Sequence, residues 1–452
     1  MRQASKILIV GGNAAGPAAA AKAKRVSPES EIILFEQSDF ISTGTCELPY
    51  VLSGIIEDYK KIVFFNDESF KEEKGVQVYI NHRVEDINRH DKYLFVRNLK
   101  DNKTYKFDYD KLILTTGSST LIPPELTGTY RNVFPLKSVS DLLRIKDSLQ
   151  KAIFKRVCII GSGYIGIETA EAFNEIGYEV ILLEKAEDPF PSASEEIKKY
   201  VTNILINNKI EFYGGVSRIN FISQEGEIKS IKIDGRKIDI DLIILAAGFR
   251  PNNRLALKTG LEIEHSGALK VNNKLQTSDN NIFAAGDNIQ VINFVTKRSD
   301  YIPLATIAHK TGHIAGANAA GGNSFINPIV KNISVKIFNK YYTCCGITEE
   351  EAKEKRIVYS TISSSAPNII KVMPQSTDVF GKILYEKYNK RILGAEFFGG
   401  KEVSGYSDMI SMMIRNSIQV TTLSETEFNY TPPLSPFINL LSILGKKAKS
   451  IN

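Results

Sequence analysis

The chain has 452 residues, which is too long for a single hydrophobic core and predicts two or three domains. Its composition, with 43% hydrophobic and 24% charged residues, is ordinary for a globular protein, and no apolar run reaches bilayer length, which argues against a membrane protein. The formal net charge of +6 suits anionic small molecules and is too diffuse to indicate nucleic-acid binding.

The cysteine content and the amino-terminal residues predict a cytoplasmic protein. Four cysteines are too few for a disulfide framework in so long a chain, and the first apolar stretch passes into a glycine motif without the cleavage site of a secretory signal. Cys158 lies within an apolar run, so we expect it in the core. Cys344 and Cys345 are adjacent, and we expect no metal site at this pair.

Residues 6–36 have the pattern of strand, glycine turn, helix and strand. The turn GGNAAG follows the apolar run KILIV, and Glu36 ends the next apolar run, twenty residues after Gly16. Glycines let a backbone approach a pyrophosphate at a helix N-terminus, and the acidic residue takes ribose hydroxyls, so the spacing predicts a dinucleotide site. Asn13 departs from this pattern, because it stands where the middle glycine is expected.

Residues 156–184 repeat this plan with the full set Gly161, Gly163 and Gly166. The acidic residue of this second unit is Glu184, eighteen residues after Gly166. A carboxylate there would repel a 2′-phosphate, which favours NADH over NADPH, and the adjacent Lys185 weakens that preference without reversing it.

Three further apolar runs end in a glycine turn, at residues 109–119, 241–252 and 277–287. The first two are expected where a chain leaves one domain for another, and the third ends in Gly286 and Asp287, an acid suited to sugar hydroxyls. We therefore predict a first nucleotide-binding domain interrupted by a second. The expected domains are 1–118 with 246–326, then 119–245, then 327–452.

The last expected domain has a different pattern. Its apolar residues alternate as in antiparallel strands, and Thr348 and Glu351 have the spacing of a capping box. The stretch SPFINLLSILGKKA, residues 435–448, is expected to form an apolar helix that needs a partner surface. The predicted fold class is α/β, with two Rossmann-like domains and a C-terminal α+β domain.

This ordered set of motifs resembles the FAD-dependent pyridine nucleotide–disulfide oxidoreductases over essentially the whole chain. The resemblance implies FAD in the first unit, NADH (with NADPH possible) in the second, and a C-terminal domain that forms a homodimer. The implied cofactor-binding residues are Gly11, Asn13, Ala14, Gly16, Glu36, Thr116, Gly117, Gly161, Gly163, Tyr164, Ile165, Gly166, Glu184, Gly248, Gly286 and Asp287.

A lone cysteine, Cys46 in STGTCELPYVLSG, distinguishes the branches of that family. Its dithiol members carry a second cysteine a few residues away, and this chain does not. The single-cysteine branch contains coenzyme A-disulfide reductases, persulfide reductases, NADH oxidases and NADH peroxidases. Ser42 and the run Leu48-Pro49-Tyr50 match the coenzyme A-disulfide reductases, whereas Ala14 stands where the oxidases and peroxidases usually have a histidine.

The resemblance implies roles for residues outside the glycine turns. Tyr164 matches a ring that covers the flavin until nicotinamide arrives. Met373 stands where the family supplies a tyrosine to the substrate, which argues more against coenzyme A as the carrier than against thiol chemistry. The implied substrate-binding residues are Lys22, Arg25, Ser42 and Thr45, and the implied catalytic residues are Cys46, His309 and Tyr430, the last contributed by the other subunit.

The implied activity is an NAD(P)H:disulfide oxidoreductase. Hydride would reach the flavin, and the electrons would pass to Cys46, which reduces a small disulfide or persulfide. A cysteine at a helix start is expected to have a lowered pKa. Two alternatives stay open: an NADH oxidase or peroxidase that uses a cysteine sulfenic acid, and a flavoprotein that transfers electrons to, or senses redox state for, another protein.

Overall fold

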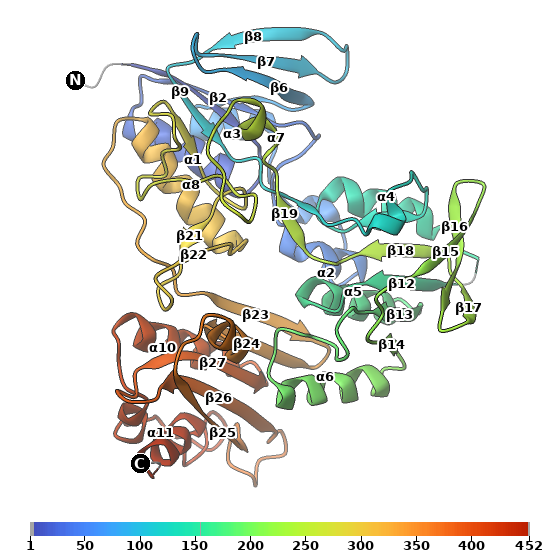
Figure 1. Ribbon diagram of the computed structural model, residues 1–452, viewed down its shortest axis with the longest axis vertical. Helices are drawn as coiled ribbons and strands as arrows, with labels where there is room; N and C mark the ends of the chain where they lie inside the picture. The colour runs from blue at the N-terminus through green and yellow to red at the C-terminus, as the bar shows by residue number, and fades with distance from the viewer. Residues whose placement is uncertain (1–3, 154, 451–452) are drawn as a thin grey trace.

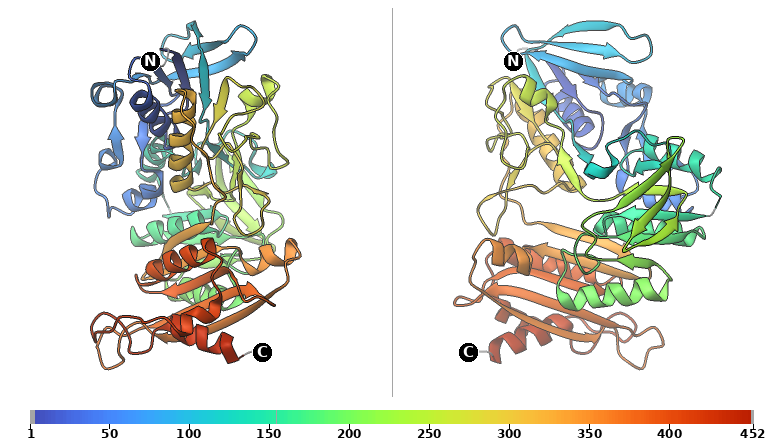
Figure 2. Two further views of the ribbon diagram at one scale, coloured as in Figure 1. Left: turned by 90° about the vertical axis from the view of Figure 1, so that its left-hand side faces the viewer. Right: turned by 45° about the vertical axis from the view of Figure 1, so that its right-hand side comes forward.

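The computed structural model describes residues 4–153 and 155–450, which form three regions, each built around its own five-stranded sheet (Figure 1). The first region lies at the top of Figure 1, the second at the right and the third, C-terminal region at the bottom. Figure 2 shows the same separation from two further sides. Among the described residues, no helix is long and apolar enough to cross a membrane.

The first sheet is parallel and has the order β20-β9-β1-β2-β5. Its strands are almost entirely apolar and buried, as is typical of parallel sheets. Helices α1 (Ala15–Val26) and α8 (Ala305–Ala319) pack closely, because Gly312 and Gly316 bring the α8 backbone against α1. The strands are β1 (Lys6–Val10), β2 (Glu31–Phe35), β5 (Gln77–Tyr79), β9 (Lys111–Leu114) and β20 (Ile282–Ala284).

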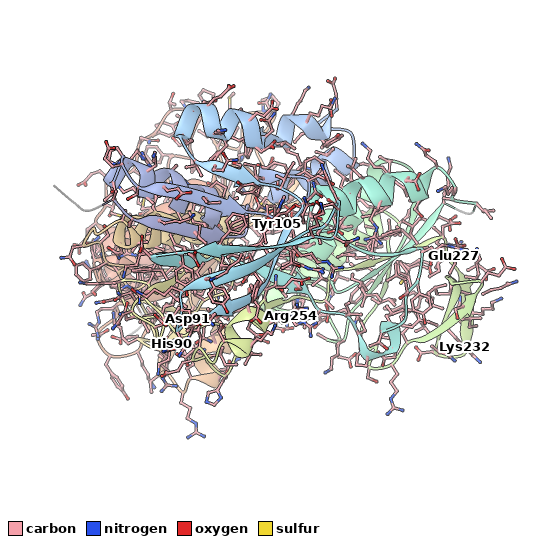
Figure 3. All side chains as sticks on the ribbon, turned by 90° about the horizontal axis from the view of Figure 1, so that it is seen from above. His90, Asp91, Tyr105, Glu227, Lys232 and Arg254 are labelled. Carbon is pink, nitrogen blue, oxygen red and sulfur yellow. The ribbon has the colours of Figure 1, made fainter. Side chains whose placement is uncertain are left out.

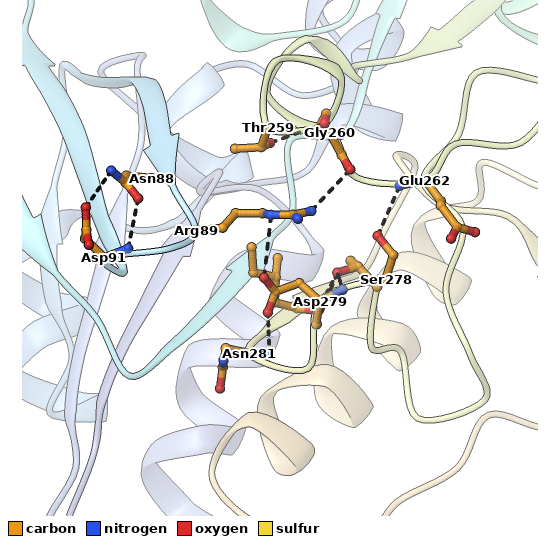
Figure 4. A network of polar contacts seen from close by, with 12 residues as sticks. Asn88, Arg89, Asp91, Thr259, Gly260, Glu262, Ser278, Asp279 and Asn281 are labelled. Atoms are coloured by element: carbon orange, nitrogen blue, oxygen red, sulfur yellow. Dashed lines mark hydrogen bonds and ion pairs between the residues drawn. The ribbon is translucent and has the colours of Figure 1, made fainter.

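An antiparallel meander of β6 (His82–Asn88), β7 (Tyr93–Asn98) and β8 (Thr104–Asp108) covers the top of the first region. Figure 3 looks down on it and labels Tyr105, His90 and Asp91 along its strands and turn. Arg89 ties its turn to later residues, since the guanidinium donates to the Gly260 carbonyl at 3.2 Å and lies 3.7 Å from the Asp279 carboxylate (Figure 4).

The second sheet, also parallel, has the order β11-β18-β12-β13-β14. Between β9 and β20 the chain crosses to this sheet and returns through β10 (Ser118–Thr120) and β19 (Phe249–Pro251), which pair with each other. The predicted α/β class with one nucleotide-binding unit inserted in another is confirmed, and the exact domain boundaries stay a prediction. The strands are β11 (Val133–Pro135), β12 (Arg156–Ile160), β13 (Glu179–Leu183), β14 (Glu211–Tyr213) and β18 (Leu242–Leu245).

A small antiparallel sheet caps the far side of the second region. It consists of β15 (Asn220–Gln224), β16 (Glu227–Ile233) and β17 (Arg236–Asp239), and it carries the half-buried Glu227 and the exposed Lys232 labelled in Figure 3.

The C-terminal sheet is antiparallel, in the order β23-β24-β27-β26-β25. The predicted capping box is present, since Thr348 accepts from the Glu351 amide and Glu351 from the Thr348 amide, at the start of α9 (Glu349–Glu354). The predicted terminal helix begins five residues later than expected, as α11 (Leu440–Ser450). Its apolar face finds a partner within this chain, packing on β25, β26 and the turn η4 (Val420–Ser424). The strands are β23 (Asn332–Ile337), β24 (Lys340–Gly346), β25 (Tyr359–Pro367), β26 (Asp378–Glu386) and β27 (Ile392–Gly399).

Side chains from the second and third regions interlock beside α6 (Glu195–Asn207). The Tyr200 ring stacks on Phe398 at 5.3 Å between centroids, and Lys382 forms an ion pair with Glu196 at 3.2 Å. Stacking and a partly buried ion pair together hold the second region on the C-terminal sheet.

Candidate active site

A cavity of about 1280 Å³ lies at the carboxyl ends of the parallel strands, between the first and second regions. This is the edge where open α/β sheets bind ligands. It brings together many of the predicted site residues with others that the sequence did not indicate. Its lining includes Gly11, Asn13, Ala14, Glu36, Thr45, Cys46, Thr116, Gly117, Lys137, Ile165, Glu168, Gly286 and Asp287.

The first glycine turn is shaped for an anion. Gly11 has a φ of +109°, and a Cβ there would overlap the Thr115 carbonyl oxygen. A Cβ on Gly16 would likewise overlap the Gly11 carbonyl oxygen, so only glycine lets α1 start this close to the strand end. No side chain caps the N-terminus of α1, which leaves backbone N–H groups facing the cavity for a pyrophosphate.

The departure at Asn13 has a structural reason. Its amide oxygen accepts hydrogen bonds from the Thr43 amide at 3.0 Å and the Ala14 amide at 3.1 Å, which ties the glycine turn to β3 (Ile41–Thr43). The side chain therefore holds the segment that leads into Cys46 against the turn. This cross-link replaces the open backbone that a middle glycine would give.

Two carboxylates in the cavity lining, those of Glu36 and Asp287, are suited to bind the sugar hydroxyls of a dinucleotide. Glu36, just after β2, accepts from the Gly12 amide at 2.7 Å and the Ser38 amide at 2.8 Å. Asp287 accepts from the Ser118 hydroxyl at 3.0 Å. An acidic residue at the end of the second strand is the usual ribose ligand, so the residues of this cavity fit FAD.

Lys137 is a cavity residue that the sequence did not indicate. Its ammonium lies 3.8 Å from the Asp287 carboxylate and 3.9 Å from the centre of the Phe249 ring. Burial lowers the pKa of Lys137 although the Asp287 carboxylate opposes the change. A cation in this position adds a charge partner for an anionic cofactor or substrate.

The second glycine turn repeats the construction of the first. Gly161 has a φ of +103°, and a Cβ on Gly166 would overlap the Gly161 carbonyl oxygen. A Cβ on Gly163 would meet nothing within 4 Å, so this glycine leaves room at the start of α5 (Tyr164–Glu175). Glu184, at the end of β13, accepts from the Ser162 amide at 2.8 Å and the Ser162 hydroxyl at 3.0 Å.

Tyr164 lies beside the cavity rather than in its lining. Its ring packs edge-on against Phe190 at 5.2 Å and stacks with Tyr342 of the C-terminal sheet at 6.3 Å, while the Ser192 hydroxyl donates to its oxygen at 3.3 Å. The neighbouring Ile165 faces the cavity instead. A gating movement of Tyr164 stays a prediction.

Cys46 opens onto the cavity from a short helical turn, η1 (Thr45–Glu47), which continues into α2 (Leu48–Leu52). Burial by the cavity walls, and then the negative charges of Glu47, Glu168 and Asp287, raise the pKa of this thiol, against the opposing charge of Lys137. The expectation of a lowered pKa is therefore wrong. One turn has little dipole to offer, and the nearby carboxylates outweigh it.

A carboxyl–phenol pair lies next to the cysteine. The Tyr50 hydroxyl, from α2, donates to the Glu168 carboxylate of α5 at 3.3 Å. Burial raises the pKa of Glu168 to about 7, although the Tyr50 hydrogen bond and Lys336 oppose this change. The sequence could not indicate this pair, because the two residues are 118 positions apart. The only signal for Glu168 in the sequence was that a charged residue stands inside the apolar stretch IGIETA.

The structure gathers several predicted residues away from Cys46. Lys22 and Arg25 on α1 lie near His313 on α8 and lower the pKa of this histidine, whose largest shift comes from burial. The exposed His309 joins them, with its ring 4.5 Å from that of His313. None of these four residues lines the cavity.

Tyr430 lies in the C-terminal region, exposed to 43%, with its ring against Phe437 at 5.4 Å. Within one chain it does not line the cavity between the first and second regions. Ser42 has a φ of +48°, and its amide donates to the Gly12 carbonyl at 2.8 Å, so it braces the cavity without lining it. Gly248 also lies outside the lining.

The remaining cysteines are structural. Cys158, Cys344 and Cys345 are fully buried, and burial raises the pKa of all three thiols. Within the described part of the chain, no three histidine, cysteine or carboxylate side chains cluster as metal ligands.

Comparisons with known proteins agree with this geometry. Residues 5–312 match the family described as pyridine nucleotide-disulphide oxidoreductase, and residues 333–440 match its dimerisation domain. The chain is 30% identical over 448 residues to the NAD(P)H coenzyme A polysulfide/persulfide reductase of Pyrococcus horikoshii, covering 98% of both chains. It is 27% identical over 452 residues to the NADH oxidase of Methanocaldococcus jannaschii, covering 98% of both.

The fold has a similar solved counterpart. The crystal structure of reduced CoADR-RHD of Bacillus anthracis superposes with a TM-score of 0.94 at 31% identity, covering 99% of this chain and 81% of that one.

Gly16→Ala should lose flavin, because its methyl group would overlap the Gly11 carbonyl oxygen and displace the start of α1. We expect the flavin-to-protein ratio, measured by visible absorbance after purification, to fall at least about tenfold, since a displacement worth 1.4 kcal/mol already costs that factor in affinity. Gly405→Ala is the matched control, because a Cβ there meets nothing within 4 Å. Equal flavin content in the two variants would contradict this view of the turn.

Glu168→Gln should stabilise the protein at high pH only. The folded-state pKa of about 7 lies above the ordinary value of 4.5, so burial of the carboxylate costs nothing below pH 4.5. The cost grows as pH rises to 7, where it reaches about 3 kcal/mol at 1.36 kcal/mol per pKa unit. We expect the variant to unfold at a higher temperature than the wild type at pH 8. At pH 4.5 we expect no difference between their unfolding temperatures. A difference independent of pH would contradict the assignment.

Proposed function

The chain belongs to the pyridine nucleotide-disulphide oxidoreductase family, and on that basis we propose that it reduces a low-molecular-weight disulfide or persulfide. It is an enzyme of the FAD- and NAD(P)H-dependent kind. The observation that supports the proposal most directly is Cys46, which opens onto the cofactor cavity while Cys158, Cys344 and Cys345 are buried. A single accessible thiol can form a mixed disulfide with a substrate sulfur but no internal disulfide.

Different residues of the cavity would bind different parts of FAD. The turn from Gly11 to Gly16 would hold the FAD pyrophosphate, with Glu36 on the ribose hydroxyls and Asp287 with Lys137 further along the cavity. When bound, the flavin passes two electrons from the nicotinamide nucleotide to sulfur. The chain itself places Cys46 on the cavity wall and places beside it Glu168, a carboxyl that can hold a proton near neutral pH.

Cys46 supplies the nucleophile. Its thiolate attacks one sulfur of the substrate and releases the other as a thiolate that must take up a proton. The carboxylates around Cys46 raise its pKa, so the thiol is mostly protonated at neutral pH. A group that removes this proton is therefore needed for attack at a useful rate.

The substrate class follows from the matched positions and the named relatives. One relative is a coenzyme A polysulfide/persulfide reductase, and Ser42 with Leu48-Pro49-Tyr50 follows the coenzyme A-disulfide reductase pattern. Lys22 and Arg25 form a cationic patch on α1, beside His309 and His313 of α8, that suits a phosphate-bearing carrier. A coenzyme A disulfide or persulfide is the proposed substrate.

A second candidate is an NADH oxidase that cycles Cys46 through a sulfenic acid, because one relative carries the name NADH oxidase. Ala14 in the first glycine turn counts against it, since a histidine there would support the sulfenic acid. Mass spectrometry of Cys46 in purified enzyme distinguishes the two: a coenzyme A adduct or persulfide supports the reductase, and a sulfenic acid supports the oxidase.

We further propose a homodimer. The match of residues 333–440 to a dimerisation domain supports it, as do the exposed apolar side chains of Leu434, Phe437 and Ile438 near Tyr430. In the dimer, Tyr430 of each chain would reach the cavity of the other.

Cys46→Ser should abolish disulfide reduction, by at least about 10³-fold, because a serine hydroxyl cannot form a mixed disulfide. Reduction of the bound flavin by NADH should persist, since the nucleotide sites are untouched. Anaerobic stopped-flow absorbance follows the flavin, and a thiol-reactive dye follows the product. Disulfide turnover by the variant would sink the proposed mechanism.

Glu184→Gln should raise the ratio of kcat/KM for NADPH over NADH by about tenfold, because it removes the charge that repels a 2′-phosphate. The glutamine oxygen can still accept from the Ser162 amide, which preserves the turn. Asp188→Asn, an exposed position four residues on, is the matched control for loss of one negative charge. If both variants change the ratio equally, Glu184 does not select the nucleotide.

A further inference from the structure

Cys46 and Glu168 line the cavity, and Tyr50, outside the lining, is hydrogen-bonded to Glu168. Tyr50 follows Cys46 by four residues along the helical run of η1 and α2, a spacing that puts both side chains on the same face. The Tyr50 hydroxyl then reaches across to α5 and donates to Glu168 at 3.3 Å. Cys46 and Glu168 both line the cavity, and the Glu168 charge acts on the Cys46 sulfur.

Among the described residues, no ion pair joins a cation to Glu168. The charge of Lys336 on β23 lowers the Glu168 pKa, but its ammonium pairs with Glu171, one turn further along α5, and lies 3.9 Å from Glu175. The Phe338 amide also donates to Glu171, at 2.6 Å. Glu168 is therefore faced by Tyr50 from α2, Cys46 from η1 and the backbone and charge of Lys336 from β23.

The other residues predicted to carry protons lie outside the cavity, and two charged residues inside it are paired. His309 is on the exposed side of α8 and Tyr430 is in the C-terminal region, and neither lines the cavity of its own chain. Lys137 and Asp287 do line it, but they pair with each other. Glu168 lines the cavity, unlike the neighbouring Glu47, and no ion pair of the described residues has to break when it gains or loses a proton.

We propose that Glu168 is the proton carrier of Cys46, and that Tyr50 positions it. The Glu168 carboxylate accepts the thiol proton as the Cys46 sulfur attacks, and the resulting carboxylic acid returns it to the thiolate that leaves. This inference rests on the proposed disulfide or persulfide reductase function.

The proposed step balances. The S–H bond of Cys46 and the S–S bond of the substrate break, and a Cys46–S–S–R bond and an O–H bond on Glu168 form. The O–H proton then passes to the departing R′S⁻ to give R′SH, which restores the carboxylate. The mixed disulfide is afterwards reduced by the two electrons that NADH supplies, which returns Cys46 and releases RSH with one proton from solvent.

The environment raises the proton affinity of Glu168 above that of an ordinary glutamate. An ordinary glutamate is a weak base toward a thiol, because its pKa lies far below that of cysteine. Burial brings the pKa of Glu168 up to about 7, which makes proton transfer from the Cys46 thiol less unfavourable. The same burial keeps Glu168 able to change its protonation state near neutral pH.

The test is the pH profile of disulfide turnover by the holoenzyme, with coenzyme A disulfide as the probe. The wild type should show kcat/KM falling below pH 7 as Glu168 becomes protonated. Glu168→Gln should lose this limb and fall about 10²–10⁴-fold. Tyr50→Phe should keep the limb but move it to higher pH, because the hydrogen bond that lowers the Glu168 pKa is gone.

Glu47→Gln is the matched control. It removes a neighbouring charge that also raises the pKa of Cys46, but it should leave the limb near pH 7 in place. A limb that survives in Glu168→Gln, or that moves in Glu47→Gln as it does in Tyr50→Phe, overturns the proposal.

A second readout needs no substrate. The pH dependence of Cys46 alkylation by iodoacetamide, followed by mass spectrometry of the Cys46 peptide, should give a lower thiol pKa in Glu168→Gln than in the wild type. An unchanged pKa overturns the inference whatever the substrate is. A lowered pKa in Glu168→Gln, together with a wild-type enzyme that reduces no disulfide, would support the coupling and count against the proposed function instead.

Discussion

The burial of Glu171 fixes the helix on which the rest of the site depends. Only 4% of this residue is exposed, and such a carboxylate is tolerated only with partners. Lys336 and the Phe338 amide supply them from the C-terminal sheet. One face of α5 is thereby held by the third region while its N-terminus forms the second glycine turn and Glu168 faces Cys46. The nucleotide turn, the cysteine and the C-terminal region are thus set by a single element.

The parts of this structure that the sequence predicts are those with a local cause. The two glycine turns follow from spacing, because a Cβ at Gly16 or Gly166 would overlap a carbonyl oxygen a few residues away. The capping box at Thr348 is local in the same way. Other contacts join residues more than a hundred positions apart, such as Tyr50 with Glu168 and Lys137 with Asp287. No pattern in a single sequence predicts such contacts.

The behaviour of Cys46 shows why a local rule fails at a site. A cysteine before a helix predicts a lowered pKa, and the helix is indeed there, with Pro49 in its first turn. What decides the pKa is burial together with three carboxylates that come from Glu47 beside it, Glu168 on α5 and Asp287 after β20. Two of the three reach Cys46 only through the tertiary fold, which places the strand ends and α5 around one cavity.

A thiol with a raised pKa fits a reductase better than an oxidase. The thiolate is the form that reacts with oxidants, so a largely protonated Cys46 is protected from oxidation while it waits for substrate. An oxidase would gain from the opposite arrangement, a standing thiolate beside the flavin. In a reductase the thiolate is needed only at the moment of attack, and a carboxylate of raised proton affinity can remove the thiol proton then. The carboxylates around Cys46 thus keep its thiol protonated and unreactive in the absence of substrate. Glu168 removes the thiol proton when the substrate is attacked.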